Sequence, residues 1–224
     1  MVAFFVPPAG FMPALTSVSF YNSATDPGNA TGSLSLPVGV RSGDVVILIA
    51  RDEYTSSPAP SVGLPSGYTQ IGTFEIGWSR YIYSWRVLSS GETTIPEYTN
   101  SPNPKAHTTR IALVFRPNFT PKAVSSSGFQ SEATNNNPAP QVIASGSGST
   151  PLVAIATWCN DNGLAVSPRT SSPSMDGEVA FPGGSGNWFY AGYKIYNSSP
   201  ANITVDMDDE GFENNLASFY VSFT

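Results

Sequence analysis

Residues 81–95 read YIYSWRVLSSGETTI, and residues 189–205 read FYAGYKIYNSSPANITV. Each segment begins with an aromatic stretch, continues through a basic residue and a polar turn, and ends in a second β-forming stretch. Because side chains alternate between the two faces of a strand, Tyr81, Tyr83 and Trp85 share one face of the first aromatic stretch. The chain therefore contains the same pair of predicted strands twice.

The similarity extends beyond these two segments at a constant offset of 108 residues. The aligned pairs are Val45 with Val153, Ile47 with Ile155, Trp85 with Tyr193, Arg86 with Lys194, and Ile95 with Ile203. The last strand of each half aligns at an offset of 106, which places Leu113 on Phe219. This two-residue change is even, so it keeps inward faces inward. Amphipathic strands also resemble one another by chance, but the shared order of landmarks favours a duplicated four-strand unit near residues 43–117 and 151–224.

Composition and periodicity predict an all-β protein. Charged residues make up only 12% of the chain, and 20 glycines and 20 prolines separate short apolar or alternating segments. No ten-residue stretch has a convincing helical period, and the central run of GDVVILIARDE (43–53) is typical of a strand that is covered on both faces. We predict an antiparallel β-sandwich, jelly-roll-like, built from two related halves that share one core.

This fold predicts one compact domain with four segments. They are an extended apolar N-terminal arm (1–15), a first β half (16–117), a connecting segment with one or two strands (118–150), and a second β half (151–224).

Charge and hydropathy exclude two classes of partner. The net charge is −6 and the ten basic residues are scattered singly, whereas nucleic-acid binding requires clustered Lys and Arg. The apolar start lacks a basic region and is interrupted by Pro7, Pro8 and Pro13, so it matches neither a signal peptide nor a membrane span. We expect a protein that is made in a cytoplasm and binds neither nucleic acid nor membrane.

The sequence contains no catalytic signature. His107 is the only histidine and falls in the predicted polar loop NSPNPKAHTT, and no Gly-x-Ser-x-Gly pattern accompanies it. Cys159 is the only cysteine and falls in the apolar run LVAIATWC, which predicts a buried, unreactive thiol. We predict that the protein is not an enzyme; the alternative, a hydrolase, would require His107 or the acids of 206–213 to line a deep pocket.

One acidic segment resembles the start of a calcium-binding loop. In DMDDEGFE (206–213), Asp206, Asp208 and Glu210 precede Gly211, but Ala217 stands where such a loop has its bidentate glutamate. A solvated acidic turn explains the segment equally simply. We therefore expect no cofactor, with calcium at these acids as the alternative.

Two groups of apolar residues are candidates for binding. Trp78 and Trp188 fall in turns just before strands, where they either stack on sugars or cover an end of the core. The arm carries the apolar side chains Phe4, Phe5, Phe11 and Met12 in a proline-rich, extended segment. Such an arm packs on its own domain or docks on a neighbouring subunit, and docking would make the protein part of an assembly.

Four motifs together resemble a class of tailed-bacteriophage virion proteins. They are Gly43-Asp44 before a strand, the Pro65–Thr69 turn (PSGYT), the aromatic strand from Tyr81 to Val87, and the closing strand from Arg110 to Phe115. The second half fits the pattern less well, because PSMDGEVAF replaces the Pro-x-Gly-aromatic turn.

The resemblance implies a non-enzymatic β-sandwich on the outside of a phage particle. Its expected role is capsid decoration or cement, as a homo-oligomer attached to other virion proteins after synthesis in the bacterial host. The alternative is a tail or fibre adhesin, that is, a carbohydrate-binding module that recognises host surface glycans.

Overall fold

The structure is a computed structural model, and it describes most of the chain. The described residues are 16–26, 32–54, 64–76, 79–96, 105–121, 124–134, 138–160, 169–182, 188–207 and 214–224. They form an antiparallel β-sandwich, as the sequence predicts.

Two five-stranded antiparallel sheets form the centre of the molecule. The first consists, from edge to edge, of β1 (Val18–Asp26), β7 (Lys105–Pro117), β3 (Val45–Tyr54), β5 (Ser79–Val87) and β4 (Thr69–Ile76). The second consists of β12 (Gly177–Pro182), β13 (Trp188–Tyr196), β10 (Leu152–Asn160), β15 (Asn214–Phe223) and β8 (Val124–Thr134).

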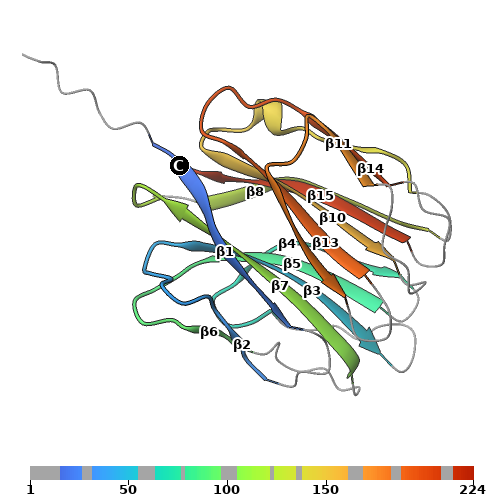
Figure 1. The fold of residues 1–224 in the computed structure, drawn as a ribbon, viewed down its shortest axis with the longest axis horizontal. Coiled ribbons are helices and arrows are strands. Elements are labelled where there is room, and N and C mark those ends of the chain that lie inside the picture. Colours follow the sequence, from blue (N-terminus) through green and yellow to red (C-terminus); the bar gives the residue numbers. More distant parts are fainter. Residues whose placement is uncertain are drawn as a thin grey trace, which may run out of the picture.

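A smaller sheet covers the outer side of each large sheet. Strands β2 (Leu34–Ser35) and β6 (Thr94–Ile95) pair on the outside of the first sheet, and β11 (Arg169–Ser172), β14 (Ile203–Met207) and β9 (Gln141–Ile143) pair on the outside of the second (Figure 1). A short 3-10 helix, η1 (Ser145–Ser147), follows β9. The described part of the fold therefore has four layers.

Three apolar cores separate these layers. The central core lies between the large sheets and joins residues of both halves, such as Ile47 and Ile155. Each half also has an outer core, which contains Leu48 in the first half and Trp158 in the second. Because β3 lies between two cores, residues 45–50 are all 0% exposed, which confirms that this apolar run is covered on both faces. The halves thus share one core and each adds its own.

The strand register confirms the predicted repeat. Val45 pairs with Val87 and Phe115 in the first sheet. Val153 pairs with Ile195 and Val221 in the second, at offsets of 108, 108 and 106 from those three residues. Residues that align in the two halves thus occupy equivalent positions in two sheets of identical strand order. The jelly-roll connectivity stays a prediction.

The repeated unit is larger than predicted. Strand β8 lies inside the predicted connecting segment, and it occupies the same edge position beside β15 that β1 occupies beside β7. The repeat therefore includes a fifth strand. Its sequence, VSSSGFQSEAT, has too few apolar residues to be recognised as a strand without its partner.

The predicted loop around His107 is wrong. Strand β7 begins at Lys105, and His107 lies opposite Glu53 of β3. The polar start of β7 is extended because β3 continues beyond its apolar centre and provides backbone partners. In the part of the chain that the structure describes, no helix is long and apolar enough to cross a membrane.

Candidate functional site

Several sequence-predicted residues lie outside the described part of the chain. These are the arm residues Phe4, Phe5, Phe11 and Met12, the turn residue Trp78, and the acids Asp208 and Glu210. Their roles stay predictions, and only Trp188 and Asp206 of the binding candidates can be placed.

Asp206 lies in β14, opposite Thr170 of β11. Its backbone carbonyl oxygen accepts a hydrogen bond from the indole Nε1 of Trp158, at 3.0 Å. Among the described residues, no group of three or more His, Cys, Asp or Glu side chains lies close enough together to hold a metal ion. The calcium hypothesis therefore depends on Asp208 and Glu210.

Trp188 is the first residue of β13 and is half-buried. Its ring stacks on Tyr190, with centroids 5.9 Å apart and an interplanar angle of 15°. The guanidinium of Arg169 lies 3.7 Å from the centre of the Tyr190 ring and donates two hydrogen bonds to the carboxylate of Glu178. These four residues form a platform on the outer face of the second half, which we call the Trp188 platform.

The charged side chains of the Trp188 platform hold one another in place. The hydrogen bonds that Arg169 donates to Glu178 raise the pKa of Arg169, and burial raises the pKa of Tyr190. The sequence predicted Trp188 but missed its neighbours, because Glu178 reaches the site through the pairing of β12 with β13 and Arg169 comes from β11 of the separate outer sheet.

The arm joins the sandwich at a firmly held corner. The Asn118 side chain accepts a hydrogen bond from the backbone N–H of Ser17 at 2.8 Å, and the Asn118 N–H donates to the Ser17 carbonyl at 2.9 Å. The next residue of the chain, Val18, is held by Asn197. The Asn197 side chain accepts a hydrogen bond from the Val18 N–H at 2.7 Å and donates one to the Val18 carbonyl at 3.2 Å. Asn118 directly follows β7 of the first half and Asn197 directly follows β13 of the second, so the ends of strands from both halves hold the base of the arm.

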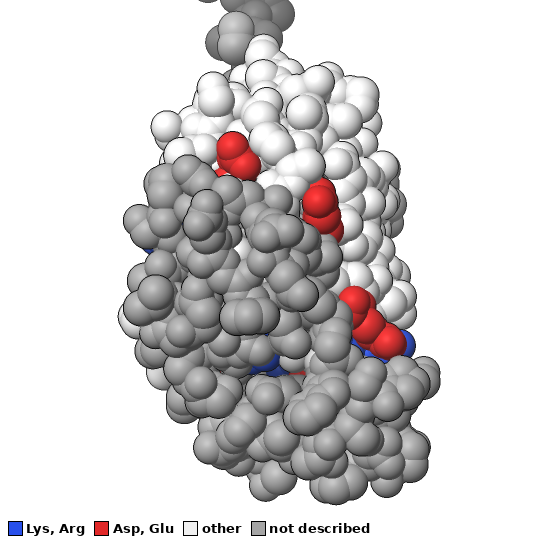
Figure 2. Space-filling model, turned by 90° about the vertical axis from the view of Figure 1, so that its right-hand side faces the viewer, with Lys and Arg blue, Asp and Glu red and all other residues white. Residues whose placement is uncertain are grey.

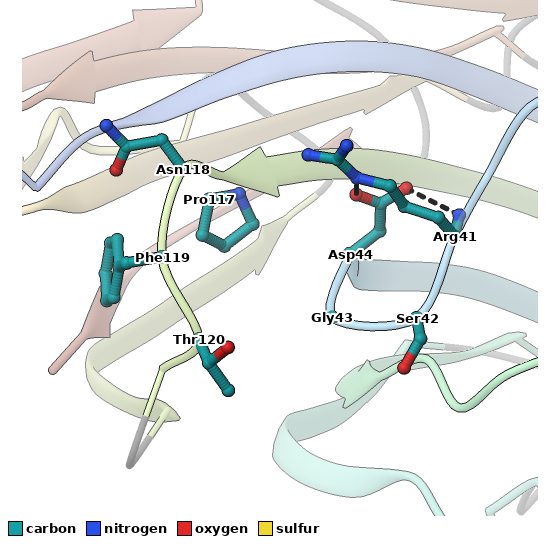
Figure 3. A pocket seen from close by; sticks show the side chains of 8 residues that line it. All are labelled: Arg41, Ser42, Gly43, Asp44, Pro117, Asn118, Phe119 and Thr120. Atoms are coloured by element: carbon teal, nitrogen blue, oxygen red, sulfur yellow. Dashed lines mark hydrogen bonds and ion pairs between the residues drawn. The ribbon is translucent and has the colours of Figure 1, made fainter.

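A polar pocket of about 360 Å³ lies beside this corner. It is lined by Arg41, Ser42, Gly43, Asp44, Pro117, Asn118, Phe119 and Thr120. Figure 3 shows that two chain segments form its walls, the turn that leads into β3 and the turn that follows β7. Asn118 thus lines the pocket and also fixes the base of the arm.

The charged groups at this pocket are bound to one another. Asp44, which is 1% exposed, accepts hydrogen bonds from Arg116 Nε at 2.8 Å and Nη2 at 2.7 Å, and from the Arg41 backbone N–H at 2.9 Å. The hydrogen bonds that Arg116 donates to Asp44 raise the pKa of Arg116. Three donors fix the Asp44 carboxylate in place, so the arrangement is suited to holding the corner rigid.

Gly39 is required at this corner. Tyr21 stacks on the Arg116 guanidinium at 3.8 Å, and its hydroxyl donates to the Val38 carbonyl at 2.7 Å. A Cβ at Gly39 would lie 2.3 Å from the Tyr21 hydroxyl oxygen, and the φ of Gly39 is +89°. The neighbouring Val38 is 96% exposed.

A buried polar network joins the two halves across the central core. The Tyr81 hydroxyl lies 3.1 Å from the Cys159 sulfur and accepts a hydrogen bond from Asn215 Nδ2 at 2.8 Å. The Tyr83 hydroxyl lies 2.9 Å from Thr157 Oγ1. Burial raises the pKa of both tyrosines. Cys159 is 1% exposed, which confirms its predicted burial; its contact with Tyr81 was not predictable from an apolar run.

The described surface carries no broad basic area on the face shown in Figure 2, where separate Asp and Glu side chains stand among uncharged residues.

Comparisons with known protein families, curated proteins and solved structures find no match to this chain.

Proposed function

We propose that this protein is a non-enzymatic structural component of a tailed-phage virion, which decorates the outer surface of the capsid as a homo-oligomer. The observation that carries the proposal is the arm base, where hydrogen bonds from both halves fix residues 17 and 18 directly after an apolar segment. An apolar segment that leaves a rigid, polar corner is suited to insertion into a neighbouring subunit. The four motifs that resemble phage virion proteins give the assembly its biological setting.

The packing of the halves supports a mechanical role. Pulling on the arm would load Asn118 and Asn197 together, and the central core and the Tyr81–Asn215 contact connect the same two halves. Load on the arm is therefore shared by the whole sandwich. The hydroxyl- and amide-rich surface, with few exposed large apolar side chains among the described residues, keeps an assembled lattice soluble.

Deletion of residues 1–15 tests this function. The full-length chain is expected to sediment as an oligomer and to bind empty capsids, whereas the truncated chain is expected to be a folded monomer that does not bind. V38S is the matched control, because it removes an exposed apolar side chain outside the arm. If the truncated chain binds capsids as well as the full-length chain, the arm has no assembly role.

The Trp188 platform favours a second candidate, a tail or fibre module that binds host glycans. Sugars stack on aromatic rings while their hydroxyls bond to nearby charged groups, and Trp188 stands beside Arg169 and Glu178. A glycan array with W188A and W78A tests it. Binding that both variants lose would favour the adhesin, and the absence of any glycan binding, with stable capsid attachment, would favour decoration.

A further inference from the structure

The four outer edges of the large sheets differ in one respect that bears on assembly. Strands β1, β4 and β8 each carry a register shift, at Tyr21, Ile71 and residues 128–129 respectively. Strand β12 pairs with β13 from Gly177 to Pro182 without a shift. A bulge disorders the free row of N–H and C=O groups on an edge, and it is a common protection against pairing with another chain. Among these four edges, β12 alone lacks this protection.

The two sides of the sandwich are also closed differently. On one side β4 contacts β8, and Phe129 lies so close to Gly72 that a Cβ there would be 2.4 Å from its ring. On the other side β1 contacts β13, the inner neighbour of β12. The inward-facing Val179 of β12 remains only partly buried. The other edges also have partly buried core residues, such as Phe20 on β1, Phe74 on β4 and Phe129 on β8, so what distinguishes β12 is its regular pairing.

The sequence of the arm fits this edge. Residues 2–6 read VAFFV, a run of β-branched and aromatic residues that is as long as a short strand. Pro7 and Pro8 follow, and a strand added to a sheet edge ends where proline removes the backbone donors. Both faces of this run are apolar, so whichever face turns inward would cover Val179.

We propose that residues 2–6 of one copy add as a strand to the outer edge of β12 in a neighbouring copy, an edge with which no described strand pairs. This inference rests on the proposed assembly role of the arm and names its docking site. A neighbour is favoured over the same chain by the connecting length. Residues 7–16 contain three prolines, which favour an extended connector of roughly 30 Å. The arm base is held by Asn197, just after β13, and β12 pairs with residues 188–193 of that strand, which lie four to nine residues or roughly 13–30 Å away. A straight connector of this length would bring residue 6 level with the far end of its own β12 and carry residues 2–6 past it.

Disulfide mapping tests this pairing directly. Five variants carry a single added cysteine, each at one of residues 2–6. Each variant is mixed with a size-tagged chain that carries A180C, since Ala180 is exposed on β12. Neighbouring strands bring paired residues within disulfide distance. We expect disulfide-linked mixed dimers at alternate arm positions, because side chains of a strand alternate between faces. S131C, exposed on the bulged edge strand β8, is the matched control and should give no linked dimer.

The other outcomes are distinct. The full-length chain could oligomerise while the arm cysteines link equally well to A180C and S131C, or to neither. In that case the arm docks elsewhere, so the β12 inference is wrong while the assembly role stands. If linkage forms only within single chains that carry both cysteines, the arm covers its own β12, and docking on a neighbour is wrong. If linkage to A180C alternates but the assembled protein does not bind capsids, the docking site stands and the virion function fails.

Discussion

The two halves have the same strand order, but they fix equivalent positions with different chemistry. In the first half, Arg86 donates a hydrogen bond to the Ser66 carbonyl at 2.8 Å and pairs with Glu92. In the second, Lys194 occupies the place of Arg86, donates to the Ser174 carbonyl at 2.9 Å and pairs with Asp176.

The acid therefore comes from a different turn in each half. Asp176 stands at the position of Tyr68, in the turn where the second half departs from the Pro-x-Gly-aromatic pattern. The role of that turn, holding the basic residue of the aromatic strand, is kept although its residues have changed. A repeat thus preserves strand register and the position of a bond more strictly than the residue types that make it.

The interface between the halves is asymmetric as well. Tyr81 and Tyr83 of the first half align with Phe189 and Ala191 of the second, so the tyrosine hydroxyls of this network come from the first half only. Their partners, Cys159 and Thr157, align with Arg51 and Ile49. Because the two partners of each bond occupy inequivalent positions, neither half could replace the other in this interface.

The largest expected effect concerns an ion pair that only the first half has. Arg110 and Asp26 are buried and bonded at the edge of the first sheet, and Leu216 opposite Glu132 takes their place in the second. R110L should lower the free energy of unfolding by about 3–5 kcal/mol, because it leaves a buried carboxylate without its partner. Urea unfolding measures the loss.

The double variant D26V/R110L is the control for that experiment. Replacing a whole buried ion pair with apolar residues is often neutral, so the double variant should recover most of the lost stability. If it is as unstable as R110L, the pair itself stabilises the edge of the first half.

The second prediction tests whether the halves unfold together. Ile47 and Ile155 are equivalent, 0% exposed, and face the shared central core. I47A and I155A should each cost about 2–5 kcal/mol, since both leave a cavity in the same core. Both should shift one transition, seen alike by tryptophan fluorescence and far-UV circular dichroism. Separate transitions for the two halves would show that the central core does not couple them.

The third prediction uses alkaline pH to probe the buried tyrosine hydroxyls of the first half. Burial raises the pKa of Tyr83 above its ordinary value of 10.0, so the folded state keeps this proton at a pH where the unfolded state loses it. Stability should therefore be complete below pH 10 and fall above it, by about 1.4 kcal/mol per pH unit for each such tyrosine. In Y83F, the free energy of unfolding should fall less steeply with pH, because one titrating hydroxyl is removed. An unchanged slope in Y83F would mean that Tyr83 ionises in the folded state.

The smallest expected effect concerns the equivalent, partly exposed ion pairs Arg86–Glu92 and Lys194–Asp176. E92Q and D176N should each lower stability by only about 0.2–1 kcal/mol, because surface pairs gain little in water. The two losses should be similar and should shrink in 1 M salt. A much larger loss in D176N would show that the changed turn of the second half depends on its acid, which also accepts the Ile195 N–H at 2.7 Å.

The sequence alone determined the fold class, the offset of the repeat and the strand that is covered on both faces. These follow from period and composition, which depend on local geometry and on burial of whole strands. Strand β8 and the start of β7 at His107 were missed, because their polar residues are extended only by virtue of their neighbours.

Only the tertiary structure brought together the Asn118–Asn197 corner, the Trp188 platform and the regular edge of β12. The corner joins residues far apart in the chain, since Val18 and its partner Asn197 are 179 positions apart, whereas the platform and the β12 edge depend on how neighbouring strands pair and pack. A hydrogen bond depends on distances of about 3 Å, which strand register and sheet stacking set, and neither can be read from a single strand's pattern. The sequence thus predicted the arm, and the tertiary structure showed how residues 17 and 18, which follow it, are held.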